Sequence, residues 1–426
     1  MKLLRALYGL RGSSTAWYRT FVRALIAAPL FYVQSQFDQC VFYRSDGLNF
    51  LIILLFVDDM LIFTNALYLK DQLVARCNQL FAVDDRGEAR WFLAIQIERN
   101  IAEGYVDLSQ EQYCKDLCEK ALGPHPIPVS TPETKEVLTK DQCPTTQAEK
   151  DEMMQFDFRG IAGKLMFNLT CVRPALMHSL KCVLQFTSNP GLAHKRALLR
   201  ICRYVAGCTD AKLRLHGARD YNVTLGIICD SDDANNPDHR RSVNCVLAFL
   251  GEYFTRANGV MIIAKPAFFD WCSAWTHKVA DSSCVSELYA IATSLRKLKY
   301  FRPFLREMAK LVKALAKLEQ LAPTPIYSDC ESAVTIAEGG HPARFKGTKH
   351  IERRFFSIQL EIALLTARMA RASSALNCAD IGATYKDVSN FVQQRNVLMG
   401  NVYAPPARPF KREQQERRVK FTIEEI

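Results

Sequence analysis

The pattern of apolar and polar residues changes along the chain and divides it into three parts. In the first part, residues 51–57 and 60–63 are short apolar runs separated by Asp58 and Asp59, which predicts a β-hairpin with an acidic turn. Residues 67–81 have helical spacing, and residues 91–98 alternate like a strand. Residues 108–122 have a second helical pattern, which opens at Ser109. The first part is therefore expected to be mixed α/β.

The middle part has the periodicity of helices. Residues 123–147 are rich in Pro, Thr and Ser and predict a linker. Apolar residues then recur at three- and four-residue spacing in residues 153–169, 173–186 and 191–205. Prolines at positions 174 and 190 mark the breaks between these helices, so a helical connection is expected here.

Strands return in the last part. Apolar runs predict strands at residues 223–229, 243–250, 261–264 and 325–328. A long helical region is expected at residues 285–318, with an interruption at Pro303, and a shorter helix at residues 331–338. Residues 396–426 lack periodicity and are expected to form a basic, solvated tail.

Composition narrows the class of protein. The chain has 426 residues with 49% hydrophobic and 23% charged residues, which is typical of globular proteins and excludes wholesale disorder. A net charge of +11 favours polyanionic partners such as nucleic acid. The 15 cysteines form no CxxC pair, which indicates free thiols in a reducing intracellular compartment, cytoplasmic or nuclear. The longest apolar run is far shorter than the ~20 residues of a membrane helix, so no membrane association is expected.

The acidic turn at Asp58 and Asp59 has two interpretations. Aspartate is a common turn residue, so the pair can be a solvent-facing turn. Two adjacent carboxylates can also bind a divalent cation for phosphoryl transfer, provided that another strand supplies further carboxylates.

Four further carboxylates lie at strand ends or in helices of the last part, namely Asp230, Glu287, Asp329 and Asp380. Each alone is explained by a turn, a solvated helix face or a helix N-cap. In an α/β segment, however, converging strand ends build metal sites, so the four together predict a shared site.

A set of basic residues follows at steps of three and four: Arg302, Arg306, Lys310, Lys313 and Lys317. This spacing predicts a positive stripe on one helix face. The stripe can be an ordinary solvated face or a contact surface for a nucleic-acid backbone.

Several motifs occur in an order that resembles the reverse transcriptase of copia-type LTR retrotransposon Pol polyproteins. They are Leu7-Tyr8-Gly9-Leu10-Arg11, Ala16-Trp17-Tyr18, Phe37-Asp38-Gln39-Cys40 and Phe56-Val57-Asp58-Asp59, followed by Phe92-Leu93-Ala94-Ile95 and Leu108-Ser109-Gln110. Arg173-Pro174 and Tyr204-Val205-Ala206-Gly207-Cys208 resemble that family's later RP and YLxGT elements.

The last part resembles the ribonuclease H domain of the same polyproteins. The matching motifs are Cys229-Asp230-Ser231-Asp232, Ser286-Glu287-Leu288-Tyr289-Ala290, Asp329-Cys330-Glu331-Ser332-Ala333, Lys349-His350-Ile351 and Ala379-Asp380-Ile381. The resemblance extends over residues 4–391, nearly the whole chain.

This resemblance implies an α/β (α+β) fold with four divisions. They are a truncated reverse-transcriptase palm and start of the thumb at 1–132, a helical thumb or connection at 133–220, a ribonuclease H-like mixed sheet with flanking helices at 221–395, and the tail at 396–426. It implies RNA-directed DNA polymerase and endonucleolytic RNA–DNA hybrid ribonuclease activities, of which the second is favoured. Asp230, Glu287, Asp329 and Asp380 are then catalytic residues that hold two Mg²⁺ or Mn²⁺ ions, and Asp58 and Asp59 are a remnant of the polymerase metal site.

Departures from the family pattern weaken the polymerase assignment. Gly12 and Ala94 replace the family's glutamine and glycine, and the family's first catalytic aspartate is expected before Leu7. A two-metal site needs its full carboxylate set, so this chain alone is not expected to polymerise. The expected partners are RNA–DNA hybrids, other nucleic acid and other Pol-derived chains that supply the missing fingers and palm. The alternatives for the whole chain are an inactive nucleic-acid-binding remnant and an unfolded relic. For His350, three roles stay open: a proton shuttle, a positioning residue or a contact to a phosphate.

Overall fold

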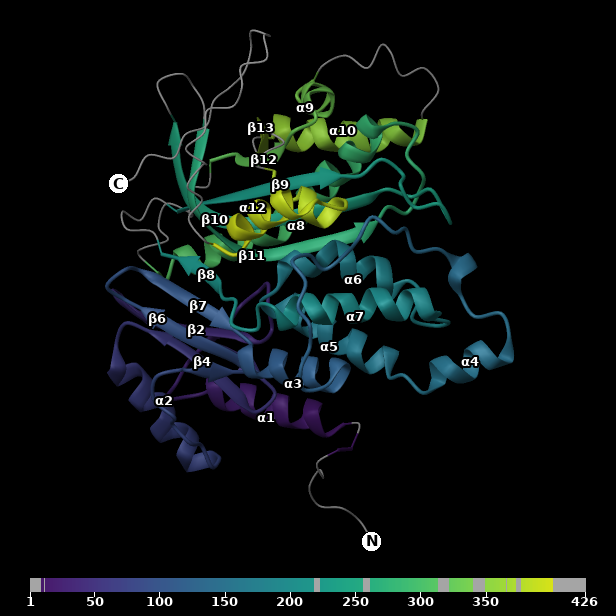
Figure 1. Cartoon of the computed structure of the whole chain (residues 1–426). Coiled ribbons are helices and arrows are strands. Elements are labelled where there is room, and N and C mark those ends of the chain that lie inside the picture. The colour runs from purple at the N-terminus through teal and green to yellow at the C-terminus, as the bar shows by residue number, and fades with distance from the viewer. Residues whose placement is uncertain are drawn as a thin grey trace. The chain divides into compact units, whose positions relative to one another are not determined.

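The structure, a computed structural model, describes residues 9–10, 12–217, 223–255, 261–312, 322–339, 349–364, 366–372 and 377–400 (Figure 1). The chain divides into two compact units. One comprises Met1–Phe92 with Tyr300–Gln320, and the other comprises Leu93–Lys299 with Leu321–Ile426. Among the described helices, none combines the length and the apolar character that a membrane crossing requires.

The first unit contains a four-stranded antiparallel sheet in the order β1-β2-β3-β4. Its elements are α1 (Ser13–Ile26), β1 (Val33–Gln34), β2 (Val41–Asp46), β3 (Asn49–Phe56), β4 (Asp59–Thr64) and α2 (Leu67–Leu80). Alternate residues of β3, Leu51, Ile53 and Leu55, are buried, as expected for a strand with one face on a core. They pack with residues of α1 and α2 in one cluster. The predicted hairpin and the helix after it are therefore confirmed.

The second unit begins with a small antiparallel sheet and a set of helices. The elements are β6 (Ile95–Asn100), β7 (Tyr105–Ser109), α3 (Glu111–Leu122), η1 (Lys140–Gln142), α4 (Gln147–Met154), α5 (Phe158–Cys171), η2 (Pro174–Leu176), α6 (Met177–Leu184), α7 (Leu192–Ala206) and β8 (Leu213–His216). Strand β7 pairs with β6 on one side and with β8 on the other. The helical character predicted for residues 153–205 is confirmed.

The last part forms a five-stranded sheet in the order β11-β10-β9-β12-β13, which can be followed in Figure 1. The elements are β9 (Val223–Ser231), β10 (Val243–Thr255), β11 (Met261–Trp275), α8 (Ser283–Ala309), β12 (Thr324–Ser328), α9 (Glu331–Ala337), α10 (Lys349–Ala363), β13 (Ala367–Arg371), α11 (Asp380–Ala383) and α12 (Val388–Leu398). Strand β10 is antiparallel to both neighbours, while β9, β12 and β13 run parallel. The predicted α/β class with a mixed sheet and flanking helices is confirmed.

The helices of the middle part and the five-stranded sheet share one hydrophobic core. Leu165, Leu180 and Leu198, from α5, α6 and α7, lie in the same buried cluster as Cys245 and Leu247 of β10. The expected divisions at 133–220 and 221–395 are therefore parts of one packed unit in the structure.

Several predicted elements differ in extent from the structure. Leu108 and Ser109 end strand β7 rather than open a helix, because Asp107 and Leu108 pair with Arg214 and Leu213 of β8. Helix α8 ends at Ala309 and contains Pro303 without interruption, and the rest of the predicted helix from residue 313 lies outside the described residues.

The strand predicted at residues 91–98 is two strands, β5 (Trp91–Phe92) and β6. Leu93 and Ala94 between them have φ angles of +50° and +60°, which break the extended backbone. Side chains with a Cβ are disfavoured at such angles, and each costs on the order of 1 kcal/mol. Ala94 stands where the resembling family has glycine, so the strain has a simple chemical origin.

The substitution Ala94→Gly is expected to raise the free energy of unfolding by about 1 kcal/mol, because Ala94 is exposed and glycine removes only the strain. Urea denaturation of the full chain measures this change. The matched control is Ala102→Gly in the β6–β7 turn, where φ is not positive and stability should fall slightly. Equal effects of the two substitutions would contradict the explanation.

Candidate metal centre

The pairing of two parallel strands brings the first two candidate carboxylates together. Ile227 and Ile228 of β9 pair with Ile326 and Tyr327 of β12 in parallel register. Asp230 near the end of β9 and Asp329 just after β12 therefore lie at the same edge of the sheet.

Helix α8 adds the third carboxylate from its second turn. Asp230, Glu287 and Asp329 each offer one oxygen atom, and these atoms lie within 4.8 Å of one another. Asp230 and Glu287 are buried, each 6% exposed, and Asp329 is half-buried. In the part of the chain that the structure describes, this is the one group of carboxylate, histidine or cysteine ligands close enough to hold a metal ion.

Asp230 lies among other negative groups. Burial raises the pKa of its carboxyl well above the usual value, and the nearby charges of Asp380 and Asp329 raise it further. The Nδ2 atom of Asn377 donates a hydrogen bond to Oδ1 of Asp230 at 2.9 Å, which fixes the orientation of the carboxylate.

Glu287 is held by two donors from the strand ends. Its Oε1 accepts from the backbone N–H of Ser231 at 3.2 Å, and its Oε2 accepts from Oγ of Ser328 at 3.4 Å. Burial raises the pKa of Glu287 to about 9, with a further contribution from the charge of Asp230. The carboxyl group is thus positioned, but its negative charge is costly without a cation.

Asp380 lies beside this group but outside the set of three. It is the first residue of α11, forms an ion pair with Lys386, and accepts a hydrogen bond from Nε2 of Gln394 at 3.4 Å. Its charge nevertheless reaches Asp230, whose pKa it raises. The structure therefore brings three predicted carboxylates together and places the fourth next to them with its own counterion.

Helix α11 is held close to the sheet by a glycine. A Cβ atom at Gly382 would clash with Sγ of Cys245 on β10. The Oγ atom of Ser273 on β11 also donates a hydrogen bond to the carbonyl oxygen of Gly382 at 2.6 Å. The close approach of α11 sets the position of Asp380.

The three carboxylates fit a divalent cation by their chemistry. Carboxylate oxygens are the ligands that Mg²⁺ and Mn²⁺ prefer. Among the described residues, no lysine, arginine or histidine forms an ion pair with Asp230, Glu287 or Asp329. Three like charges in a mostly buried space repel one another, and a bound cation removes that repulsion.

Asp232 resembles part of the same motif but has a different environment. It is buried, its backbone N–H donates to the carbonyl oxygen of Val243 on β10, and its carboxylate accepts a hydrogen bond from the backbone N–H of Val243. Its carboxylate therefore closes the end of the β9–β10 ladder, which is a structural role.

The acidic turn of the first unit lacks the partners that a metal site requires. Asp58 and Asp59 are exposed at the β3–β4 turn, where Val57 has a φ of +55° and its carbonyl accepts a hydrogen bond from Trp17 Nε1 at 2.8 Å. No third carboxylate joins them among the residues that the structure describes.

Among the described residues, one member of the predicted basic stripe is buried. Arg302 is only 6% exposed, and burial lowers its pKa to about 10, so it is part of the packing of α8. Arg306 and Lys310 are exposed, although Lys310 follows the end of the helix. Lys313, Lys317 and the side chain of His350 lie outside the described residues.

Comparison with known proteins finds a family match in the first part of the chain and relatives along most of it. Residues 1–135 match the reverse transcriptase (RNA-dependent DNA polymerase) family. The retrovirus-related Pol polyprotein from transposon TNT 1-94 of Nicotiana tabacum is 30% identical over 383 residues, which cover 89% of this chain and 26% of that protein. The corresponding polyprotein from transposon RE1 of Arabidopsis thaliana is 26% identical over 379 residues, or 89% of this chain and 23% of that protein.

Two other similarities cover parts of the chain. An uncharacterized mitochondrial protein of Arabidopsis thaliana is 32% identical over 199 residues, or 47% of this chain and 78% of that protein. The solved structure of LC11-RNase H1, isolated from compost, aligns with 38% of this chain and 92% of its own at 17% identity and a TM-score of 0.25.

Residues 1–135 therefore form a reverse-transcriptase domain, and over 89% of its length the chain is homologous to Pol polyproteins of plant copia-type transposons. It spans about a quarter of the length of the curated Pol relatives that it matches.

The raised pKa of Glu287 predicts a pH-dependent stability in the absence of divalent cations. Its pKa rises from 4.5 to about 9 on folding, so the folded chain binds more protons between these values and loses stability as the pH rises through them. In EDTA at pH 8, Glu287→Gln should therefore melt on the order of 5 °C higher than the wild type, and near pH 4 the difference should vanish.

The matched control is Glu331→Gln, an exposed neighbour at the start of α9 that makes the same change of charge. Because Glu287 is retained, the difference in melting temperature between Glu331→Gln and the wild type should not change with pH. Addition of Mg²⁺ should stabilise the wild type and not Glu287→Gln. If Glu287→Gln and Glu331→Gln changed the melting temperature by the same amount at every pH, the raised pKa of Glu287 would not be the cause of the pH dependence.

Proposed function

We propose that the chain cleaves the RNA strand of RNA–DNA hybrids by two-metal phosphoryl transfer. Asp230, Glu287, Asp329 and Asp380 would hold two Mg²⁺ or Mn²⁺ ions at the edge of the sheet. The observation that carries the proposal is the convergence of Asp230, Glu287 and Asp329, three carboxylates from separate elements, within 4.8 Å. The reverse-transcriptase match and the homology to Pol polyproteins support a nucleic-acid substrate.

The chain's own residues prepare the site for cations. Asn377 orients Asp230, while Ser231 and Ser328 orient Glu287. The raised pKa values of Asp230 and Glu287 mean that both must lose a proton when a cation binds, so cation affinity should increase with pH. When bound, the ions supply an activated water and stabilise the leaving oxygen.

Lys386 gives Asp380 a distinct role. Its ammonium group pairs with Asp380, so Asp380 joins a second cation only when this ion pair opens. Without that opening, Lys386 remains as a fixed positive charge beside the three other carboxylates. Selectivity for the hybrid would come from its 2′-hydroxyl groups and its shape.

The reverse-transcriptase part would contribute nucleic-acid binding rather than polymerisation in this chain alone. The pair Asp58 and Asp59 has no third carboxylate among the described residues, and a two-metal polymerase site requires a full set. We therefore propose that other Pol-derived chains complete the polymerase site where polymerisation occurs. The functional divisions would be palm and thumb at 1–132, connection at 133–220, ribonuclease H at 221–395 and a basic tail at 396–426.

Cleavage of a labelled RNA–DNA hybrid tests the proposal directly. Asp329→Asn is expected to lower the rate by about 10²-fold or more, because a bound cation supplies several kcal/mol of charge stabilisation. Glu331→Gln, two residues away and exposed, is the control and should cleave at the wild-type rate. Equal rates for wild type and Asp329→Asn would refute the assignment of the site.

The alternative is an inactive nucleic-acid-binding remnant of a Pol protein. The net charge of +11 and the ion pair between Lys386 and Asp380 favour it, since the lysine occupies one ligand of the proposed site. Binding of the hybrid by folded wild-type protein without cleavage in Mg²⁺ or Mn²⁺ would support this alternative. A cooperative thermal transition would exclude the unfolded relic.

A further inference from the structure

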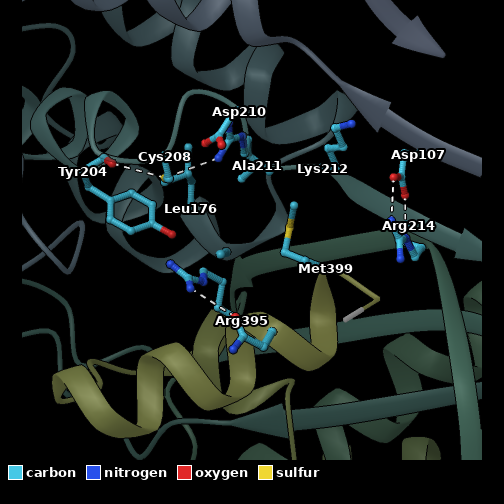
Figure 2. Close-up of a pocket in the computed structure, with 13 residues that line it drawn as sticks. Asp107, Leu176, Tyr204, Cys208, Asp210, Ala211, Lys212, Arg214, Arg395 and Met399 are labelled. Carbon is cyan, nitrogen blue, oxygen red and sulfur yellow. Dashed lines mark hydrogen bonds and ion pairs between the residues drawn. The ribbon is translucent and has the colours of Figure 1, made fainter. Parts of the chain in front are cut away.

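The second unit contains a cavity, whose lining residues are drawn in Figure 2. Its volume is about 360 Å³, and its walls come from β7, η2, α7, β8, α12 and the segment between α7 and β8. None of its lining residues is one of the four candidate metal ligands. The volume is at the lower end of the range of about 300–1,000 Å³ that is typical of small-molecule sites.

The cavity carries more positive than negative charge. Four cationic side chains line it, Arg173, Lys212, Arg214 and Arg395, against two carboxylates, Asp107 and Asp210. Arg214 pairs with the buried Asp107 through two contacts of 2.8 Å, from Nε and Nη2. Figure 2 shows this pair on the β7–β8 side of the cavity, with Arg395 on α12.

The charge of Lys212 is also compensated, because its ammonium group forms an ion pair with Glu98 of β6. Arg173 and Arg395 remain. Among the described residues, neither of them forms an ion pair with a carboxylate. Asp210 also lines the cavity and forms no ion pair among the described residues, so two guanidinium groups and one carboxylate remain, with a net positive charge.

Arg173 is the more buried of the two. Arg173 is only 3% exposed, and its Nη2 donates a hydrogen bond to the carbonyl oxygen of Thr209 at 2.8 Å. Its Nη1 lies 3.4 Å from Sγ of Cys208, and its Nε has no hydrogen-bond partner among the described residues. Neutral acceptors do not cancel a buried charge, so this guanidinium is costly unless an anion joins it.

Tyr204 does not provide that anion. Burial raises its pKa to about 12, although the nearby charges of Arg395 and Arg173 lower it. The phenol is therefore protonated at neutral pH. Its proximity to both arginines also shows that the two guanidinium groups approach the same space.

We propose that this cavity binds a phosphate monoester, with Arg173 and Arg395 as its charged ligands. The planar guanidinium group matches the oxygen geometry of phosphate, and two of them outweigh the one remaining carboxylate, Asp210. Arg173 and Tyr204 belong to the RP and YLxGT-like sequence elements, for which the hybrid-cleaving site has no role. The phosphate can be inorganic phosphate, a nucleoside 5′-monophosphate or the 5′-phosphate of a nucleic-acid strand.

Calorimetric titration of the full chain tests the proposal with four probes. They are inorganic phosphate, a nucleoside 5′-monophosphate, and one oligonucleotide with and without a 5′-phosphate. Arg395→Gln should weaken the binding of the phosphate-bearing probes about tenfold or more, because it removes one charged ligand. Arg196→Gln is the matched control, since Arg196 is exposed on α7 and does not line the cavity.

Arg395 is chosen over Arg173 because it is only half-buried, so its replacement is expected to leave the fold intact. Binding of phosphate or the mononucleotide points to a free ligand, whereas binding of only the 5′-phosphorylated strand points to a nucleic-acid end. Equal affinities of wild type, Arg395→Gln and Arg196→Gln for every probe would overturn the proposal. Hybrid cleavage by Arg395→Gln, measured in parallel, should be unchanged, so the two functions fail or succeed independently.

Discussion

The parallel pairing of β9 with β12 is the interaction on which the candidate metal centre depends. It places Asp230 and Asp329 at one edge of the sheet, although 98 positions separate them in the sequence. Helix α8 then adds Glu287, and the three carboxylates become mostly buried together. Burial of like charges opposes folding, so this arrangement is stable only with protonated carboxyl groups or with a cation.

Much of the fold follows from local pattern. The β3–β4 hairpin, helix α2 and the helices of residues 153–205 agree with the periodicity of their apolar residues. The break between β5 and β6 does not, because an unusual φ at Leu93 and Ala94 leaves no mark on the alternation of side chains. Likewise, Ser109 reads as a helix start, but the pairing of β7 with β8 draws the preceding residues into a strand.

The carboxylates of the site could be predicted from the sequence, but the hydrogen-bond donors that orient them could not. Asp230, Glu287 and Asp329 stand at strand ends or in a helix, and their motifs identify them. The donors that orient them come from chain segments far away in sequence, and only the tertiary structure shows that Asn377 reaches Asp230. The need for glycine at position 382 also becomes visible only in the structure, where Sγ of Cys245 leaves no room for a Cβ atom. The burial of Arg302 was equally invisible, because helical spacing does not show which face of α8 packs.

Direct titration with Mn²⁺, followed by electron paramagnetic resonance, tests the central claim that the edge of the sheet is a cation site. The account predicts saturable Mn²⁺ binding by the wild type, unchanged binding by Asp58→Asn, and loss of that binding in Asp230→Asn. Equal binding by Asp230→Asn and the wild type would contradict it, because Asp230 lies at the centre of the proposed ligand set.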